Sequence, residues 1–307
     1  MTMQISTNQF YNSANATMSQ LTDQADKLQT QISTGKKLQA PSDDVVAYQQ
    51  LQLLSRATAN DAAYTTNVSS AQSLLNQSDS TLSSIVSQIQ SAQELATQAN
   101  GGTLSNDQMN DIATQLNGII SSLVSLANTT NAQGTPLFAG SQGTTPVTQN
   151  ADGTVTVNDT GNTISIPISD DTSVAPNNTA QDVFGGIQTS SGTSDLFSIL
   201  TNLVSGLQAG GSTAASAAST AVSSLSAALD HVSNAQASVG AREARLTLVS
   251  SSMTDMATTR ETQRSALEDT DVTSAVTDLQ KTMTILQATQ ASFTKLTSLS
   301  LFNYLQQ

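Results

Sequence analysis

Few residues in this chain could carry acid–base or metal chemistry, and none of them forms a recognised set. His231 is the only histidine and cysteine is absent, so imidazole and thiolate ligands for zinc cannot be assembled. The acidic cluster of Glu268, Asp269 and Asp271 lacks the D-x-D-x-D-G spacing, closed by a glutamate, that a calcium loop requires. We expect Asp271 to cap a helix that begins beside it.

No motif supports nucleophilic catalysis or phosphate binding. The sequence contains no G-x-S-x-G elbow, and no glycine-rich loop follows a predicted strand. Arg242 and Arg245 are the remaining candidates. Either they lay their aliphatic stems along a helix face with the guanidinium in water, or they form ion pairs with acidic residues of a neighbouring helix. The sequence therefore predicts no enzyme, no cofactor and no metal site.

The charge is distributed unevenly. The net charge is −13, yet all ten lysines and arginines lie before Ala57 or after Ala241. Twelve acidic residues fall between these blocks, and the other eleven nearly balance the ten cations. A middle segment without cations cannot neutralise phosphates, which excludes nucleic-acid binding. Either the acids form a solvated outer face, or the balanced ends pack against other subunits while the acidic middle faces water.

Composition favours long, thin helices that pack through small residues. We call the line of residues along which one helix contacts another its seam. Aromatic residues make up 3% of the chain and tryptophan is absent. No apolar run is long enough to span a bilayer, and the N-terminus does not resemble a cleaved secretory signal. We therefore expect a soluble protein that, if it leaves the cell, does so without a cleaved signal of the Sec type.

Both ends of the chain carry apolar residues at alternating steps of three and four, as in a helix that lies along another helix. The residues expected to pack between helices are Met18, Leu21, Leu28, Ile32, Val276, Leu279, Met283, Leu286, Phe293, Leu301 and Phe302. Neither end can bury its stripe alone. The two ends are therefore expected to pair with each other or with copies of themselves.

A turn is predicted after the first of these seams. Gly35 suits the left-handed position that closes a helix, and Pro41 prevents the helix from continuing. Ser42 is then expected to cap the next helix, with Asp43 and Asp44 in its first turn, where carboxylates favour the positive end of the helix dipole.

The centre of the chain contains further helical patterns and one segment whose composition and spacing are typical of turns and strands. In residues 141–192 proline, glycine and asparagine are dense, and Thr154–Val157 and Thr163–Ile168 alternate with the period of strands around a turn at 158–162. We predict a mainly α fold, in which the N- and C-terminal arms form a long antiparallel helical bundle or coiled coil and a small β-rich domain is inserted.

Three domains are predicted on this basis. Residues 1–42 and 270–307 form a terminal coiled-coil domain, residues 43–140 and 193–269 form a helical rod, and residues 141–192 form the β-rich outer domain.

Four segments resemble the bacterial flagellin superfamily. Residues 32–44 (ISTGKKLQAPSDD) are similar to its N-terminal signature, in which a helix ends at a turn before a DD pair. Residues 126–140 (LANTTNAQGTPLFAG) resemble its hairpin entry, and residues 239–246 (VGAREARL) its returning helix. Residues 299–305 (LSLFNYL) resemble the C-terminal segment of one branch of this superfamily, the proteins at the junction between hook and filament. The likeness covers both helical arms.

The resemblance implies a structural subunit of the extracellular bacterial flagellum, in the layer between hook and filament. It implies terminal helices that are disordered in the free monomer, export of the unfolded chain by the flagellar type III apparatus, and pairing of the helices after installation. The implied partners are copies of the chain itself, hook-associated protein 1, flagellin and an export chaperone, with no nucleic acid and no membrane insertion. A filament flagellin is the alternative within the family.

Two other classes of function stay open at this point. The β-rich insert could serve as an adhesin or glycan-binding module, although its single aromatic residue, Phe184, disfavours sugar stacking. A signalling coiled coil of the chemoreceptor kind would need a membrane span, which the sequence lacks.

Overall fold

The computed structural model describes residues 2–102, 104–151 and 153–305, with side chains from residue 9 to residue 295 within these ranges. By its contacts the chain divides into two compact units. Unit 1 comprises Met1–Ala59 and Met256–Gln307, and unit 2 comprises Asn60–Asp255. The boundary therefore falls inside two long helices, whereas the sequence suggested domain limits near residues 42 and 270 and around the insert.

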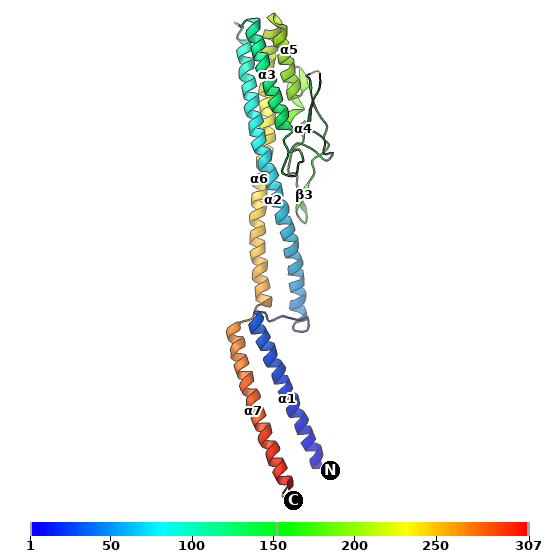
Figure 1. Ribbon diagram of the computed structural model, residues 1–307, viewed down its shortest axis with the longest axis vertical. Helices are drawn as coiled ribbons and strands as arrows, with labels where there is room; N and C mark the ends of the chain where they lie inside the picture. The colour runs from blue at the N-terminus through cyan, green and yellow to red at the C-terminus, as the bar shows by residue number, and fades with distance from the viewer. Residues whose placement is uncertain (1, 103, 152, 306–307) are drawn as a thin grey trace. The chain divides into compact units, whose positions relative to one another are not determined.

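Long helices make up most of the described chain (Figure 1). The helices are α1 (Thr2–Thr34), α2 (Val45–Asn100), α3 (Asn106–Ala127), α4 (Ala180–Phe184), α5 (Leu196–Ala209), α6 (Gly211–Glu268) and α7 (Val272–Leu305). The strands are β1 (Val147–Gln149), β2 (Val155–Val157), β3 (Ile166–Ser169), β4 (Thr172–Val174), β5 (Ile187–Thr189) and β6 (Gly192–Ser194). The predicted mainly α fold with a small β-rich insertion is confirmed. Among the described helices, none has a stretch apolar enough to cross a membrane.

In unit 1, α1 and α7 lie side by side and antiparallel (Figure 1). Ala25 and Ala275 are buried, and the rings of Tyr11 and Phe293 meet nearly at right angles with their centroids 5.5 Å apart. The larger apolar residues that face the partner helix are only half-buried. Two helices can cover only one side of each other, so this pair buries little apolar area by itself.

The core of unit 2 lies among α2, α3, α5 and α6. Its fully buried aliphatic residues include Leu75, Leu82, Ile85, Ile89, Leu116, Leu123, Leu200 and Leu225. The first turns of α6 contribute mainly small residues, such as Ala214, Ala218 and Ala221, and larger ones, among them Leu246 and Met253, follow along the helix. At Gly206 of α5, an added Cβ would overlap the Cβ of Ala217 on α6, so the close approach of these two helices requires glycine.

The strands form three separate two-stranded antiparallel sheets, pairing β1 with β2, β3 with β4 and β5 with β6. The two strand-like segments predicted on either side of residues 158–162 contain β2 and β3, which do not pair with each other but with β1 and β4. The carbonyls of Thr160 and Asn162 accept hydrogen bonds from the N–H groups of Gln142 and Ser141. Gly140 allows this approach, since a Cβ there would overlap the Thr160 carbonyl oxygen.

Three phenylalanines join the β-rich insert to the helices of unit 2. Phe184 of α4 packs between Phe138 and Phe197, with centroid separations of 5.7 and 5.5 Å, and all three rings are fully buried. Helix α4 is fixed at its start by Thr179 and Asp182, whose side chains form a capping box. The insert is thus anchored by a small aromatic core.

We predict that Phe184→Ala destabilises unit 2 by about 3–5 kcal/mol, the usual cost of deleting a buried ring. Thermal unfolding of the full chain, followed by circular dichroism, measures the loss. Ile164→Ala is the control, because Ile164 is exposed and its loss should cost less than about 0.5 kcal/mol. Equal effects of the two substitutions would contradict the role of the aromatic core.

Candidate assembly interface

Two turns of unit 1 are joined to each other, the turn after α1 and the turn between α6 and α7. Gly35, with a φ of +71°, ends α1 in the left-handed region, as predicted. Its carbonyl accepts a hydrogen bond from Thr270 N–H at 2.9 Å, and Lys37 N–H donates to the Glu268 carbonyl at 2.7 Å. This short antiparallel bridge links positions more than two hundred residues apart in the sequence.

Charged side chains reinforce the bridge. Lys36 pairs with Glu268, which also accepts a hydrogen bond from Arg264 at 2.7 Å. Arg264 pairs with Glu261 as well, and these hydrogen bonds raise the pKa of its guanidinium. Lys37 Nζ donates to the Ala266 carbonyl, near the negative end of α6. Because Lys36, Arg264 and Glu261 are well exposed, each pair adds little stability and the network mainly fixes geometry.

The PSDD segment differs in detail from the prediction. Asp44, not Ser42, caps α2, since its Oδ1 accepts hydrogen bonds from Val46 N–H and Ala47 N–H. Pro41 and Ser42 are exposed in the turn before α2. The Ser42 assignment was wrong because α2 begins two residues later than the pattern suggested. Asp271 caps α7 as expected, accepting from Thr273 N–H and Ser274 N–H.

Asp43 ties the turn back to α1 and does not enter α2. Its carboxylate accepts hydrogen bonds from Lys27 Nζ at 2.7 Å and from the N–H groups of Gln39 and Ala40. The hydrogen bond from Lys27, with the two backbone donors behind it, lowers the pKa of Asp43 to about 2.

The seam residues of α1 and α7 divide into two groups. Met18, Leu21, Leu28 and Ile32 on α1, and Leu279, Leu286 and Phe293 on α7, are half-buried. Val276 and Met283 are 36% and 43% exposed, and Ala275 and Thr282 are buried in the neighbouring positions. The seam of α7 thus runs through a threonine, which apolar spacing alone does not reveal. The side chains of Leu301 and Phe302 lie outside the described residues.

Arg242 was expected either to keep its guanidinium in water or to pair with an acidic residue of a neighbouring helix, and among the described residues it forms no such ion pair. Its Nη1 donates to the carbonyls of Ala175 and Asn177 at 2.9 and 3.0 Å, and its Nη2 donates to the Asn178 side chain. Burial lowers the pKa of Arg242, and the charge of Asp182 opposes that effect. Arg242 therefore fastens a loop of the insert to α6. Arg245 is exposed and forms no ion pair with any residue in the described part of the chain.

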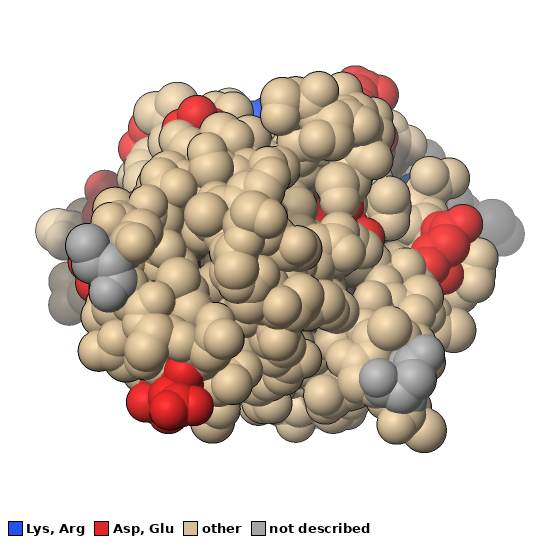
Figure 2. Space-filling model, turned by 90° about the horizontal axis from the view of Figure 1, so that it is seen from above, with Lys and Arg blue, Asp and Glu red and all other residues tan. Residues whose placement is uncertain are grey.

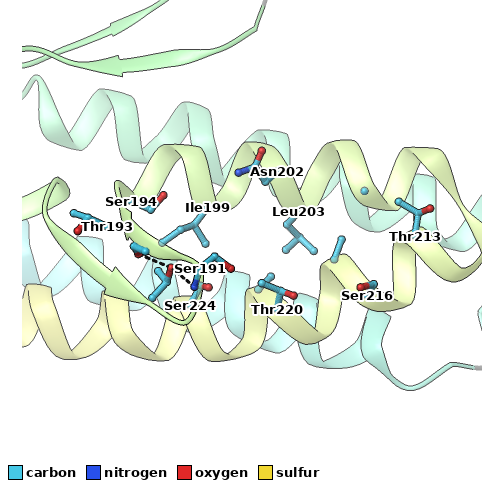
Figure 3. A pocket seen from close by; sticks show the side chains of 15 residues that line it. Ser191, Thr193, Ser194, Ile199, Asn202, Leu203, Thr213, Ser216, Thr220 and Ser224 are labelled. Carbon is cyan, nitrogen blue, oxygen red and sulfur yellow. Dashed lines mark hydrogen bonds between the residues drawn. The ribbon is translucent and has the colours of Figure 1, made fainter.

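The described residues hold no cluster of metal-ligating groups. His231 Nε2 lies 3.0 Å from the carbonyl oxygen of Asp182, so the imidazole helps to seat α4 on α6. A hollow of about 440 Å³ lies between the β5–β6 hairpin, α5 and α6 (Figure 3). It is lined by hydroxyl, amide and aliphatic groups such as Thr193, Asn202 and Leu203, and no lining side chain is ionisable. Its lining offers no acid–base pair.

The two units differ sharply in charge. Unit 2 contains fourteen acidic residues and two arginines, whereas unit 1 contains nine acidic residues and eight cations. The net charges are therefore −12 and −1. The face in Figure 2 shows scattered acidic residues on a largely uncharged surface.

We predict that Arg242→Lys loosens the loop at residues 175–178, because one ammonium group cannot serve all of these acceptors at once. Hydrogen exchange of the loop amides should accelerate, and the variant should lose about 1–3 kcal/mol of stability. Arg245→Lys is the matched control and should leave exchange unchanged. Equal exchange in both variants would exclude the fastening role of Arg242.

A second prediction concerns acid. Because the folded pKa of Asp43 lies below its ordinary value of 3.8, its contribution to stability is complete above pH 3.8 and is lost as the pH falls towards about 2. Asp43→Asn should remove this pH dependence, as measured by thermal unfolding across that range. Asp23→Asn, at an exposed position of α1, should retain it. If Asp43→Asn also retained it, Asp43 would not be its source.

Comparison with known proteins identifies the family. The family model for the bacterial flagellin N-terminal helical region matches residues 5–143, and the model for the C-terminal helical region matches residues 222–305. Flagellar hook-associated protein 3 of Salmonella typhimurium is 30% identical over 295 residues, covering 90% of this chain and 91% of that protein. Its counterpart in Escherichia coli K12 is 29% identical over 296 residues, covering 89% and 90%.

The fold has a counterpart among solved structures. The flagellar junction protein FlgL from Legionella pneumophila matches with a TM-score of 0.61 at 17% identity, covering 72% of this chain and 100% of that one. Both helical arms and the fold agree with the resemblance read from the sequence. The chain belongs to the bacterial flagellin family, in its hook-associated protein 3 branch.

Proposed function

We propose that this chain is a structural subunit of the bacterial flagellum and forms the layer between hook and filament. The observation that carries the proposal is the match of both helical arms to the flagellin models, together with relatives named hook-associated protein 3 that align over about 90% of their length. The described residues contain no cluster of acidic, histidine or cysteine side chains that could hold a metal ion, so no metal centre competes with this assignment.

The terminal helices are the assembly elements of this proposal. The α1–α7 pair leaves its apolar seam half-covered, as expected of helices that are completed by neighbouring subunits. In the free monomer these helices are disordered, and the chain leaves the cell as an unfolded thread through the type III export apparatus, guided by an export chaperone. The absence of cysteine is compatible with export of the unfolded chain, because no disulfide can form before assembly.

The proposed partners are copies of the chain itself, hook-associated protein 1 on the hook side and flagellin on the filament side. The chain acts mechanically and not as an enzyme. Its place is outside the cell, in the flagellum. Leu301 and Phe302 are proposed to anchor in the assembled tube.

A filament flagellin is the second candidate, because both matching models describe flagellin itself. The two candidates differ in what a cell without the gene would make. Loss of a junction layer leaves the filament subunit intact but gives it nothing to assemble on. Loss of the filament subunit removes the subunit itself.

We predict that deletion of the gene gives cells with hooks but no filaments, and that flagellin accumulates in the medium. Electron microscopy and electrophoresis of the culture supernatant measure both outcomes. Filaments should return when the full-length gene is restored, but not with a gene lacking the last ten codons. Hooks without filaments and without flagellin in the medium would point to the filament subunit, and intact filaments would contradict both candidates.

A further inference from the structure

Exposed apolar side chains are concentrated in unit 1. Eleven large hydrophobic residues are exposed among the described side chains. Nine of them lie in unit 1, and two, Ile164 and Leu248, lie in unit 2. Scattered apolar residues are normal on a protein surface, but their concentration in one unit marks a surface that contacts another molecule.

On α7 some of these residues form a second stripe beside the covered one. Val272, Val276 and Met283 follow one another at steps of four and seven and therefore share one face of the helix. They are 46%, 36% and 43% exposed. Exposed glutamines, Gln280 and Gln287, lie on the same face. A helix with two adjacent apolar stripes is typical of a helix that packs on two sides.

The first turns of α2 show the same arrangement. Ala47, Leu51 and Leu54 are buried or half-buried, whereas Val46 and Leu53 are 65% and 64% exposed. Leu53 stands at a groove of about 450 Å³ between α2 and α6, lined also by Leu54, Ala266 and Leu267. Its two polar lining residues are Gln50 and Gln263. The groove is thus an aliphatic hollow with glutamines and no charged group in its lining.

The stripe and the groove are chemically complementary. Each has an aliphatic centre accompanied by glutamine amides, which can both donate and accept hydrogen bonds. Charge limits which partner can cover them. Unit 1 has a net charge of −1, so copies of unit 1 can approach one another without strong repulsion, whereas unit 2, at −12, would repel its own copies. A second copy of unit 1 therefore meets both requirements.

We propose that the groove beside Leu53 receives the stripe of Val272, Val276 and Met283 from α7 of a neighbouring copy. This contact is heterologous, since each copy offers a groove to one neighbour and a stripe to another, and such contacts build rings or helical rows. The inference rests on the proposed function, because it names the surfaces through which copies of the subunit meet.

The absence of cysteine allows a direct test by disulfide cross-linking. Two tagged chains of different size, Leu53→Cys and Val276→Cys, are produced together in the deletion mutant, and isolated flagella are oxidised mildly. The matched control replaces Val276→Cys by Leu248→Cys, at a position that is 73% exposed in unit 2. We expect at least ten times more heterodimer from the Leu53–Val276 pair than from the control pair. All three positions are exposed, and thermal unfolding verifies that each variant is folded.

The outcomes separate this inference from the proposed function. If the variants restore filaments but the two pairs cross-link equally or not at all, the inference is overturned and the function stands. A Leu53→Cys product with a protein other than this chain, in place of the heterodimer, would also overturn it. If the unsubstituted chain does not restore filaments, the proposed function itself fails.

Discussion

Helices in this chain depend on partners that are distant in the sequence. Each long helix carries a narrow apolar stripe, and a narrow stripe stabilises a helix only when another helix covers it. Helix α1 is covered by α7, which follows it by more than two hundred residues. The bridge between Gly35–Lys37 and Glu268–Thr270 holds the two turns of unit 1 together, and it therefore also fixes where α1 and α7 begin their contact.

Unit 2 also joins helices that are distant in the sequence, but it buries a larger core of its own. Its helices bury a continuous set of leucines and isoleucines, and the three phenylalanines attach the insert to them. Polar contacts complete the attachment. Tyr64 donates to Asp170, Asn67 donates to the Pro167 carbonyl, and Arg242 binds the loop before α4. The insert is thus part of the folded unit, although its strands are short and paired only in twos.

Periodic spacing predicted the helices well and the short strands poorly. The long seams repeat many times, so an error at one position does not hide them. Strands of three or four residues offer too few repeats. Their spacing also does not indicate that β1 pairs with β2, or that the side chain of Asn128 exchanges hydrogen bonds with Val147 of β1. Thr282 was missed because a polar residue can occupy a position between packed helices. The role of Arg242 was not predicted because two of its acceptors are backbone carbonyl oxygens, which the side-chain types of a sequence do not indicate.

The distribution of cations has a further consequence for proteolysis. Proteases that cleave after lysine or arginine find no such residue from Ala57 to Ala241, a span that includes nearly all of unit 2. Within unit 2 their two targets are Arg242 and Arg245, both on helix α6, and Arg242 is engaged with the insert. Enzymes of the trypsin type would therefore leave this span in one piece even while unit 2 is unfolded. Resistance of this span to such proteases follows from the absence of lysine and arginine and does not depend on the fold.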